Sequence, residues 1–103
     1  MIVVFVTVPN RSTATRLAQT LVKEKRAACV NIVPGLESHY IWRGKLERSR
    51  ELLLIIKSTR RGYAALERRI KALHPYTVPE IIALPIQRGS ASYLKWLSDA
   101  VRA

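Results

Sequence analysis

The stretch that decides the fold is His74-Pro75-Tyr76-Thr77-Val78-Pro79-Glu80, which leads directly into the apolar run 81–86. Each proline restricts its own backbone and pushes the residue before it, His74 or Val78, out of the helical region. A helix is therefore expected to end at His74, and a stiff extended connector then carries the chain into a strand. Pro85 cannot donate a ladder hydrogen bond, so this strand is expected at a sheet edge or at a bulge.

On either side of the connector the sequence predicts helices. Before it, a helix is expected from about Gly62, with apolar residues at helical spacing: Tyr63, Leu66, Ile70 and Leu73. After the strand, Gly89-Ser90 breaks the chain, and Ser90 or Ser92 is positioned to cap a last helix. The apolar face of that helix consists of Tyr93, Leu94, Trp96, Leu97, Ala100 and Val101.

The first third of the chain has a strand–helix–strand pattern. Residues 2–8 are almost all β-branched or aromatic, which is typical of a central strand. After Pro9-Asn10, Ser12 or Thr13 can cap a helix. Its apolar residues fall on one face: Ala14, Leu17, Ala18, Leu21 and Val22. The run 28–33 predicts a second strand, which is expected to end at Pro34-Gly35.

Between these two halves, residues 36–58 predict a long β-hairpin arm. Large and polar residues alternate over 38–42, Arg43-Gly44-Lys45 offers a turn, and the return strand becomes the apolar run 52–56. The complete order predicts an α+β, ferredoxin-like (split βαβ) sandwich with a C-terminal helix, formed as a single domain over residues 1–103. The edge strand, the projecting hairpin and the apolar last helix together predict an oligomer that forms by strand pairing.

Composition and charge limit the classes of function. Apolar residues make up 49% of the chain, which excludes a disordered protein. The run 2–8 is too short to span a bilayer and lacks the features of a secretory signal, so we expect a cytoplasmic protein without membrane association. The single Cys29 agrees with a reducing compartment. A net charge of +11 predicts only non-specific attraction to polyanions.

Motifs spread over nearly the whole chain carry a family resemblance. They are Ala27-Ala28-Cys29-Val30-Asn31-Ile32-Val33-Pro34-Gly35, Ser38, Tyr40 through Trp42 to Gly44-Lys45, Glu51, Lys57, His74-Pro75-Tyr76, Val78-Pro79-Glu80, and Tyr93-Leu94 with Trp96. In order and spacing they resemble the divalent-cation tolerance (CutA-type) family. The resemblance implies a homotrimer related in architecture to PII signalling proteins, a cytoplasmic location, and a role in tolerance of copper and other divalent metals.

The same resemblance implies that His74 is a metal ligand. Some bacterial relatives carry a cysteine at the position of Val6 and a histidine at that of Leu73, and these are implicated in copper binding with the equivalent of His74. Valine and leucine cannot ligate a metal, so only His74 is carried over. A weaker site for Cu(II) or another divalent cation, shared between subunits, would combine His74 with Glu80 or His39. No organic cofactor is indicated.

The family pattern also implies a cleft between subunits. The predicted cleft residues are Cys29, Glu37, Tyr40, Trp42, Lys57, Tyr76 and Glu80. Such a cleft offers an alternative function, a PII-like signalling protein that binds a small anionic ligand. Simpler explanations apply to some members. Cys29 is expected to be buried in its apolar strand, and Tyr40 and Trp42 share a face that suits packing against a neighbouring subunit.

Two further classes fit the sequence poorly. Cys29, His74 and Glu80 have the residue types of a nucleophile, a base and an orienting acid, but no nucleophile elbow or glycine-rich phosphate loop surrounds the cysteine. We therefore expect no enzymatic activity. Specific nucleic-acid binding is not expected either, because the two central strands of the predicted sheet offer only Phe5 for stacking on RNA bases.

Overall fold

The computed structural model describes residues 1–102. Its elements, in chain order, are β1 (Ile2–Val8), α1 (Arg11–Lys23), β2 (Cys29–Trp42), β3 (Lys45–Ser58), α2 (Tyr63–Leu73), β4 (Ile81–Pro85) and α3 (Ala91–Ala100). The sheet has the strand order β2-β3-β1-β4, and every neighbouring pair is antiparallel. This is the split βαβ topology that the sequence predicts, with β1 in a central position and β4 at an edge.

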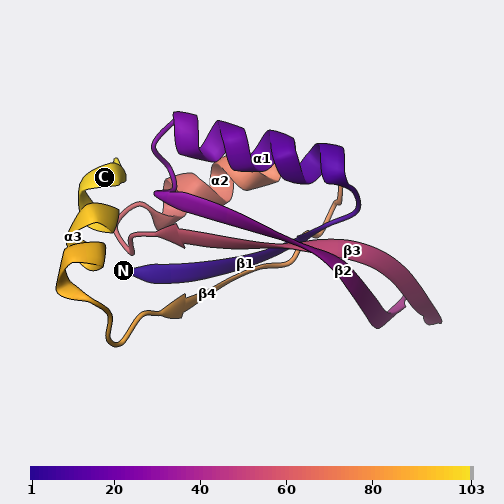
Figure 1. Ribbon diagram of the computed structural model, residues 1–103. Coiled ribbons are helices and arrows are strands. Elements are labelled where there is room, and N and C mark those ends of the chain that lie inside the picture. The colour runs from indigo at the N-terminus through magenta and orange to yellow at the C-terminus, as the bar shows by residue number, and fades with distance from the viewer. Residues whose placement is uncertain (103) are drawn as a thin grey trace.

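The helices α1 and α2 cover one face of the sheet, and the β2–β3 hairpin twists away beyond it (Figure 1). The core lies between these two layers. Its fully buried residues come from both layers: Val4, Val6, Val8, Leu54 and Ile56 from the sheet, and Ala14, Leu17, Leu21, Leu66 and Ile70 from the helices. Burying one such valine, leucine or isoleucine side chain stabilises the fold by about 1.5–3 kcal/mol.

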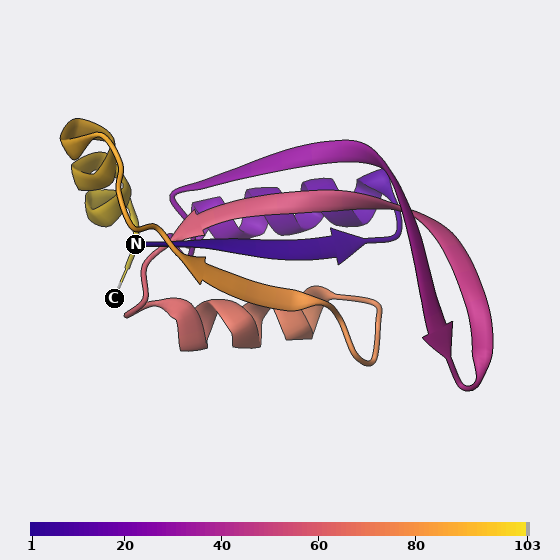
Figure 2. The ribbon, with the colours of Figure 1, turned by 90° about the horizontal axis from the view of Figure 1, so that it is seen from below.

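The opposite face of the sheet, which we call the open face, has no such cover. In the described part of the chain no helix crosses in front of the strands when they are viewed from below (Figure 2). The strand registers place seven apolar side chains on this face: Val3, Phe5, Val33, Leu53, Ile55, Ile82 and Leu84. Ile82 and Leu84 are 51% and 45% exposed. This face is therefore an apolar surface without a partner in the chain.

Local signals placed the ends of the helices well, with one exception. α2 ends at His74, and the side chain of Ser90 caps α3 by accepting a hydrogen bond from Tyr93 N at 3.2 Å. The prediction that Ser12 or Thr13 caps α1 is wrong. Asn10 is the cap, because its backbone is extended and its Oδ1 accepts a hydrogen bond from Thr13 N at 2.9 Å.

The prediction that a strand ends at Pro34-Gly35 is also wrong. β2 continues to Trp42 and pairs with β3 on both sides of a β-bulge between Val33 and Leu36. Pro34, which has no N–H, lies in this bulge, and Gly35 supplies the left-handed φ of 85° there. The hairpin turn is where the sequence predicts it. Arg43 and Gly44 both have positive φ, as in a type I′ turn.

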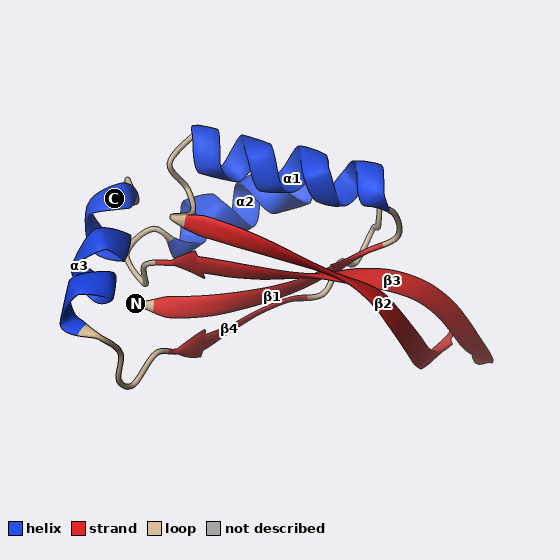
Figure 3. Cartoon of the chain, in the orientation of Figure 1, coloured by secondary structure: helices blue, strands red, loops and turns tan. Residues whose placement is uncertain are grey.

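The connector 74–80 forms a loop between α2 and β4, close to the place where the hairpin leaves the sheet (Figure 3). No helix within residues 1–102 has both the length and the apolar composition needed to cross a bilayer.

Candidate functional site

A cleft of about 690 Å³ lies where the hairpin arm, the end of β1 and the connector meet. It is lined by Thr7, Ser38, His39, Tyr40, Trp42, Glu51, Pro75, Tyr76, Thr77, Val78 and Glu80. These residues supply two carboxylates, one imidazole and three aromatic rings. None of the lining residues is a lysine or an arginine, although the chain has 18 of them. The cleft is thus an acidic and aromatic site in a basic protein.

His74 anchors the connector beneath this cleft. The imidazole is 7% exposed, and its Nε2 lies 2.8 Å from the carbonyl oxygen of Thr7 in β1. Its Nδ1 accepts a hydrogen bond from Tyr76 N at 3.1 Å. This arrangement requires a proton on Nε2, which donates to the carbonyl, and a free lone pair on Nδ1. Both ring nitrogens are therefore engaged within the chain, and a metal ion could bind only by displacing one partner.

Tyr76 and Glu51 join the connector to the base of the hairpin. The Tyr76 hydroxyl donates a hydrogen bond to Glu51 Oε2 at 2.9 Å across 25 residues of sequence. Burial, followed by the hydrogen bond to the Glu51 carboxylate and its charge, raises the pKa of Tyr76 to about 12. The hydroxyl therefore stays protonated at neutral pH and remains a donor to the carboxylate.

Of the two carboxylates that line the cleft, Glu80 was predicted from the sequence and Glu51 was missed. The Glu51 side chain is buried, only 7% exposed, although it is an acid. A signal was present, since Glu51 directly precedes the apolar run 52–56 and alternates with Leu53 and Ile55 along β3. An acid at such a position is directed to the face of the sheet that carries these apolar residues.

His39 differs from His74 in being exposed on the hairpin arm. Its Nε2 lies 2.7 Å from Glu37 Oε2, and it lines the cleft while Glu37 does not. Two neighbours on the arm are also held in place. Tyr40 Oη lies 3.1 Å from Ser49 Oγ, and the Arg43 guanidinium lies 5.9 Å from the centroid of the Trp42 ring.

The structure divides the predicted cleft residues into two groups. Tyr40, Trp42, Tyr76 and Glu80 line one cleft, with Glu37 beside it. Cys29 and Lys57 do not line this cleft within one chain, and their place in a cleft between subunits stays a prediction. Lys57 lies on β3 roughly 20 Å beyond Glu51, at about 3.3 Å per residue.

Cys29 and Lys57 face each other across β2 and β3. The Lys57 Nζ contacts Asn31 Oδ1 and lies 4.0 Å from Cys29 Sγ. Cys29 is partly exposed rather than buried, because this end of β2 is at the sheet edge and the open face has no cover.

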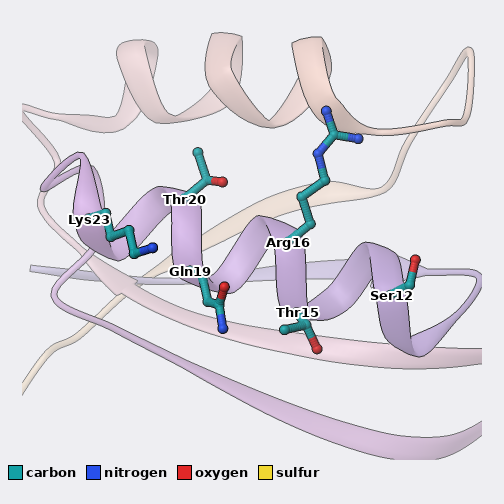
Figure 4. A pocket seen from close by; sticks show the side chains of 6 residues that line it. All are labelled: Ser12, Thr15, Arg16, Gln19, Thr20 and Lys23. Atoms are coloured by element: carbon teal, nitrogen blue, oxygen red, sulfur yellow. The ribbon is translucent and has the colours of Figure 1, made fainter.

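A second hollow, of about 510 Å³, follows the outer surface of α1. It is lined by Ser12, Thr15, Arg16, Gln19, Thr20 and Lys23, whose side chains point away from one another rather than toward a common centre (Figure 4). Polar groups that diverge in this way cannot surround a ligand, so we interpret this hollow as ordinary helix surface.

The residues present do not form a closed metal site. Within residues 1–102 no three histidine, cysteine, aspartate or glutamate side chains lie close enough together to hold a metal ion. Metal binding by one chain would have to use two side chains, or side chains from more than one copy.

Known proteins share this architecture and sequence. Residues 2–100 match the model of the CutA1 divalent ion tolerance protein family. The chain belongs to this family. The divalent-cation tolerance protein CutA of Thermus thermophilus is 54% identical over 97 residues, which cover 94% of each chain. The chloroplastic protein CutA 1 of rice is 54% identical over 101 residues, and this CutA1 family member spans 57% of the rice protein's length.

Solved structures of CutA1 proteins confirm the fold. The T. thermophilus protein superposes with a TM-score of 0.96 at 51% identity, covering 99% of this chain and 100% of the other. CutA1 from Pyrococcus horikoshii gives a TM-score of 0.94 at 37% identity, with both chains fully covered. The rice relative is described as chloroplastic and an Archaeoglobus fulgidus CutA as periplasmic, so a cytoplasmic location stays a prediction for this CutA1 family member.

Proposed function

We propose that this CutA1 family member is a non-enzymatic divalent-cation tolerance protein that acts in the cytoplasm as a homotrimer and binds copper or another divalent cation weakly. The observation that carries the metal-binding part is His39, an exposed imidazole 2.7 Å from the Glu37 carboxylate at the edge of a cleft without lysine or arginine. Imidazole nitrogen and carboxylate oxygen are both ligands that Cu(II) accepts.

His39 suits this role better than His74. A metal at His74 would have to break the hydrogen bond to Thr7 or the one from Tyr76, both of which hold the connector in place. His39 has only the exposed Glu37 as a partner, and this carboxylate can become the second ligand. Two ligands from one chain give weak binding, which a second copy of the chain would strengthen.

The open face supports assembly of several copies. Seven apolar side chains lie there without cover, and the sheet has two edge strands, β2 and β4, that can pair with another chain. A closed ring of three copies, as the family resemblance implies, would bury the open face of each chain near the symmetry axis.

A small anionic ligand is not favoured in this cleft. Glu51 and Glu80 would repel an anion, and Lys57, the cation expected to bind it, lies elsewhere on β3. The comparisons with relatives likewise favour a divalent-cation tolerance protein over a PII-like sensor.

The test is calorimetric titration of the metal-free protein with Cu(II) and Zn(II), with the mass in solution measured by light scattering on the same sample. We expect a trimer that binds Cu(II), and we expect His39→Gln to weaken this binding at least about tenfold, since even groups outside the ligand shell have effects of that size. The matched variant His74→Gln, checked for folding by circular dichroism, should keep it. Loss in His74→Gln alone would assign the metal to His74, and absence of binding in the wild type would refute direct metal binding.

A further inference from the structure

We infer that the outer surface of α1 and α2 binds the phosphate backbone of a double-stranded nucleic acid without reading its sequence. We call this surface the basic layer; it is the outer side of residues 11–26 and 60–71, which include α1 and most of α2. The inference goes beyond the proposed function, because it uses neither the proposed metal ligands nor the cleft at the base of the hairpin. It can therefore hold or fail separately from metal binding.

The first argument is that the positive charge of the chain is concentrated in the basic layer. Residues 11–26 and 60–71 contain ten of the 18 lysines and arginines but only two of the seven acids, so they hold +8 of the net charge of +11. The two acids, Glu24 and Glu67, are already paired with Arg69 and Lys71. Within residues 1–102 no acid lies within ion-pair distance of the other eight cations. The layer therefore presents a positive field that attracts a polyanion.

The second argument is the direction in which these side chains project. On α1, four exposed residues repeat at helical spacing on the side opposite to the buried Ala14, Leu17 and Leu21. On α2 and the turn before it, four exposed residues lie in the same way opposite to the buried Leu66 and Ile70. The two outer rows are Ser12, Arg16, Gln19 and Lys23, and Arg61, Ala64, Arg68 and Lys71. Five of these eight side chains are cations that point directly away from the sheet.

Assembly through the open face leaves the basic layer accessible. The helices α1 and α2 lie on the opposite side of the sheet from the open face (Figure 1), and they contact each other there. In a ring of three copies that buries each open face near the symmetry axis, the helices form the outside of the assembly. The premise of an accessible basic layer therefore holds for the proposed homotrimer as it does for one chain, and a trimer presents the layer three times.

The chemistry of the outer rows suits a phosphate backbone better than a membrane surface. Three of the five cations are arginines, whose guanidinium groups can donate two hydrogen bonds to one phosphate. Ser12 and Gln19 stand between the cations of α1, and hydroxyl and amide side chains also contact phosphates in nucleic-acid complexes. A helix that lies in a membrane surface needs large apolar side chains to insert. The only apolar residue of the two rows is Ala64, so a lipid bilayer would gain little from them.

The geometry of the layer suits a long ligand. The side chains on α1 point away from one another (Figure 4), so they cannot enclose a small anion. The row from Ser12 to Lys23 is about 16 Å long at about 1.5 Å per residue, and packed helices lie about 8–10 Å apart. A nucleic-acid duplex carries about one phosphate per 1.7 Å of its axis. A rod with charges at this spacing can place several phosphates on the separate cations of one layer.

The test is fluorescence anisotropy of a labelled DNA duplex of about two helical turns, titrated with the assembled, metal-free protein at a series of salt concentrations. We expect a Kd of about 10⁻⁴–10⁻⁶ M near physiological salt, as is typical of non-specific binding. Log K should fall against log salt concentration with a slope of about −3 to −4.5, as expected when about three to five cations contact phosphates. A duplex of unrelated sequence should bind equally well. No binding at low salt, or a strong preference for one sequence, would overturn the inference.

A double variant locates the binding surface. Arg16→Gln with Arg68→Gln removes one cation from each row, and it should make the salt slope shallower by about 2 and weaken binding at least about tenfold at low salt. The matched control, Arg43→Gln with Lys45→Gln, removes the same charge at the exposed hairpin turn, far from the helices (Figure 1), and should bind nearly as the wild type does. Equal weakening in both would show that binding follows net charge alone and would overturn the inference.

Two further measurements separate this inference from its alternatives. Sedimentation with vesicles of phosphatidylcholine and phosphatidylserine tests a lipid partner, and binding to these vesicles without binding to the duplex would overturn the inference. A Cu(II) titration of Arg16→Gln with Arg68→Gln should match that of the wild type, because neither residue belongs to the proposed metal site. Loss of duplex binding with intact Cu(II) binding is therefore the expected result for this variant, with its mass in solution unchanged.

Discussion

The two faces of the sheet are built from the same strands, yet they differ in almost every physical property. On the face under α1 and α2, Val4, Val6, Leu54 and Ile56 are fully buried. On the open face their sequence neighbours are equally apolar but remain partly exposed, with Ile82 more than half exposed. Strands that are apolar on both faces suit a sheet covered on both sides. The comparison shows that one chain supplies only the first of these two covers.

The largest effect is expected on the covered face. Leu54→Ala removes a fully buried side chain beneath the helices and should lower the free energy of unfolding by about 2–5 kcal/mol. The measurement is chemical denaturation at a fixed protein concentration, because assembly also contributes to apparent stability. The oligomeric state should not change. A loss below about 1 kcal/mol, the average for any substitution, would contradict tight packing on this face.

A substitution on the open face should affect assembly more than folding. Leu84→Asp places a charge at an apolar position that only another copy would cover, so the mass in solution should fall to that of a monomer while the far-ultraviolet circular dichroism is kept. Val22→Asp is the matched control, since Val22 on α1 is exposed to a similar extent, 42% against 45%. Its mass should stay unchanged. An unchanged mass in both variants would remove the open face from the assembly surface.

The third prediction concerns Glu51, which lies beyond Leu53 on the open face and binds the Tyr76 hydroxyl. The pKa of Tyr76 is raised from 10.0 to about 12 in the folded chain. The folded state holds the Tyr76 proton more tightly than the unfolded state, so the protonated hydroxyl stabilises the fold. This stabilisation is complete below pH 10 and is lost as the pH rises from 10 toward 12. Tyr76→Phe should remove this part of the alkaline loss, as measured by unfolding at stepwise increasing pH. The same alkaline slope in both proteins would contradict the raised pKa.

The smallest effect is expected from the ion pair between the two helices that cover the sheet. Arg69 of α2 donates two hydrogen bonds, each of 2.8 Å, to the carboxylate of Glu24, the residue that follows the end of α1. The hydrogen bond to Arg69 lowers the pKa of Glu24, so its stabilisation is present above the unfolded-state pKa and is lost as the pH falls through the folded value. Arg69→Ala should therefore destabilise the protein slightly at neutral pH and less in acid. The measurement is the free energy of unfolding of the wild type and of Arg69→Ala, each at neutral pH and in acid. Equal destabilisation at both would indicate a packing effect of the arginine stem instead.

The order of elements was predictable from the sequence because its signals are local. Period-2 and period-3.6 patterns, the two prolines of the connector, and Arg43-Gly44 at the turn each act within a few residues. The bulge at Pro34-Gly35 was not predictable in this way. Proline and glycine end many strands, and only the pairing of β2 with β3 on both sides shows that this strand continues.

The site was predictable only in part, for the same physical reason. Tyr40, Trp42, Tyr76 and Glu80 line one cleft within the chain, whereas Lys57 lies far along β3. The link between Tyr76 and Glu51 depends on the angle at which the hairpin leaves the sheet, and no local pattern encodes that angle. The hydrogen bonds of His74 likewise become visible only when β1 and the connector lie side by side.

A proline at the end of β4 and a β-bulge in β2 limit how the two edge strands of the sheet can pair with other chains. β4 has five residues and ends at Pro85, and the opposite edge strand β2 carries the bulge at Pro34-Gly35. A filament of the cross-β type grows only when each chain offers a long, regular row of free N–H and C=O groups to the next. Neither edge offers one, so strands as apolar as these can join a small number of copies without seeding an endless fibre.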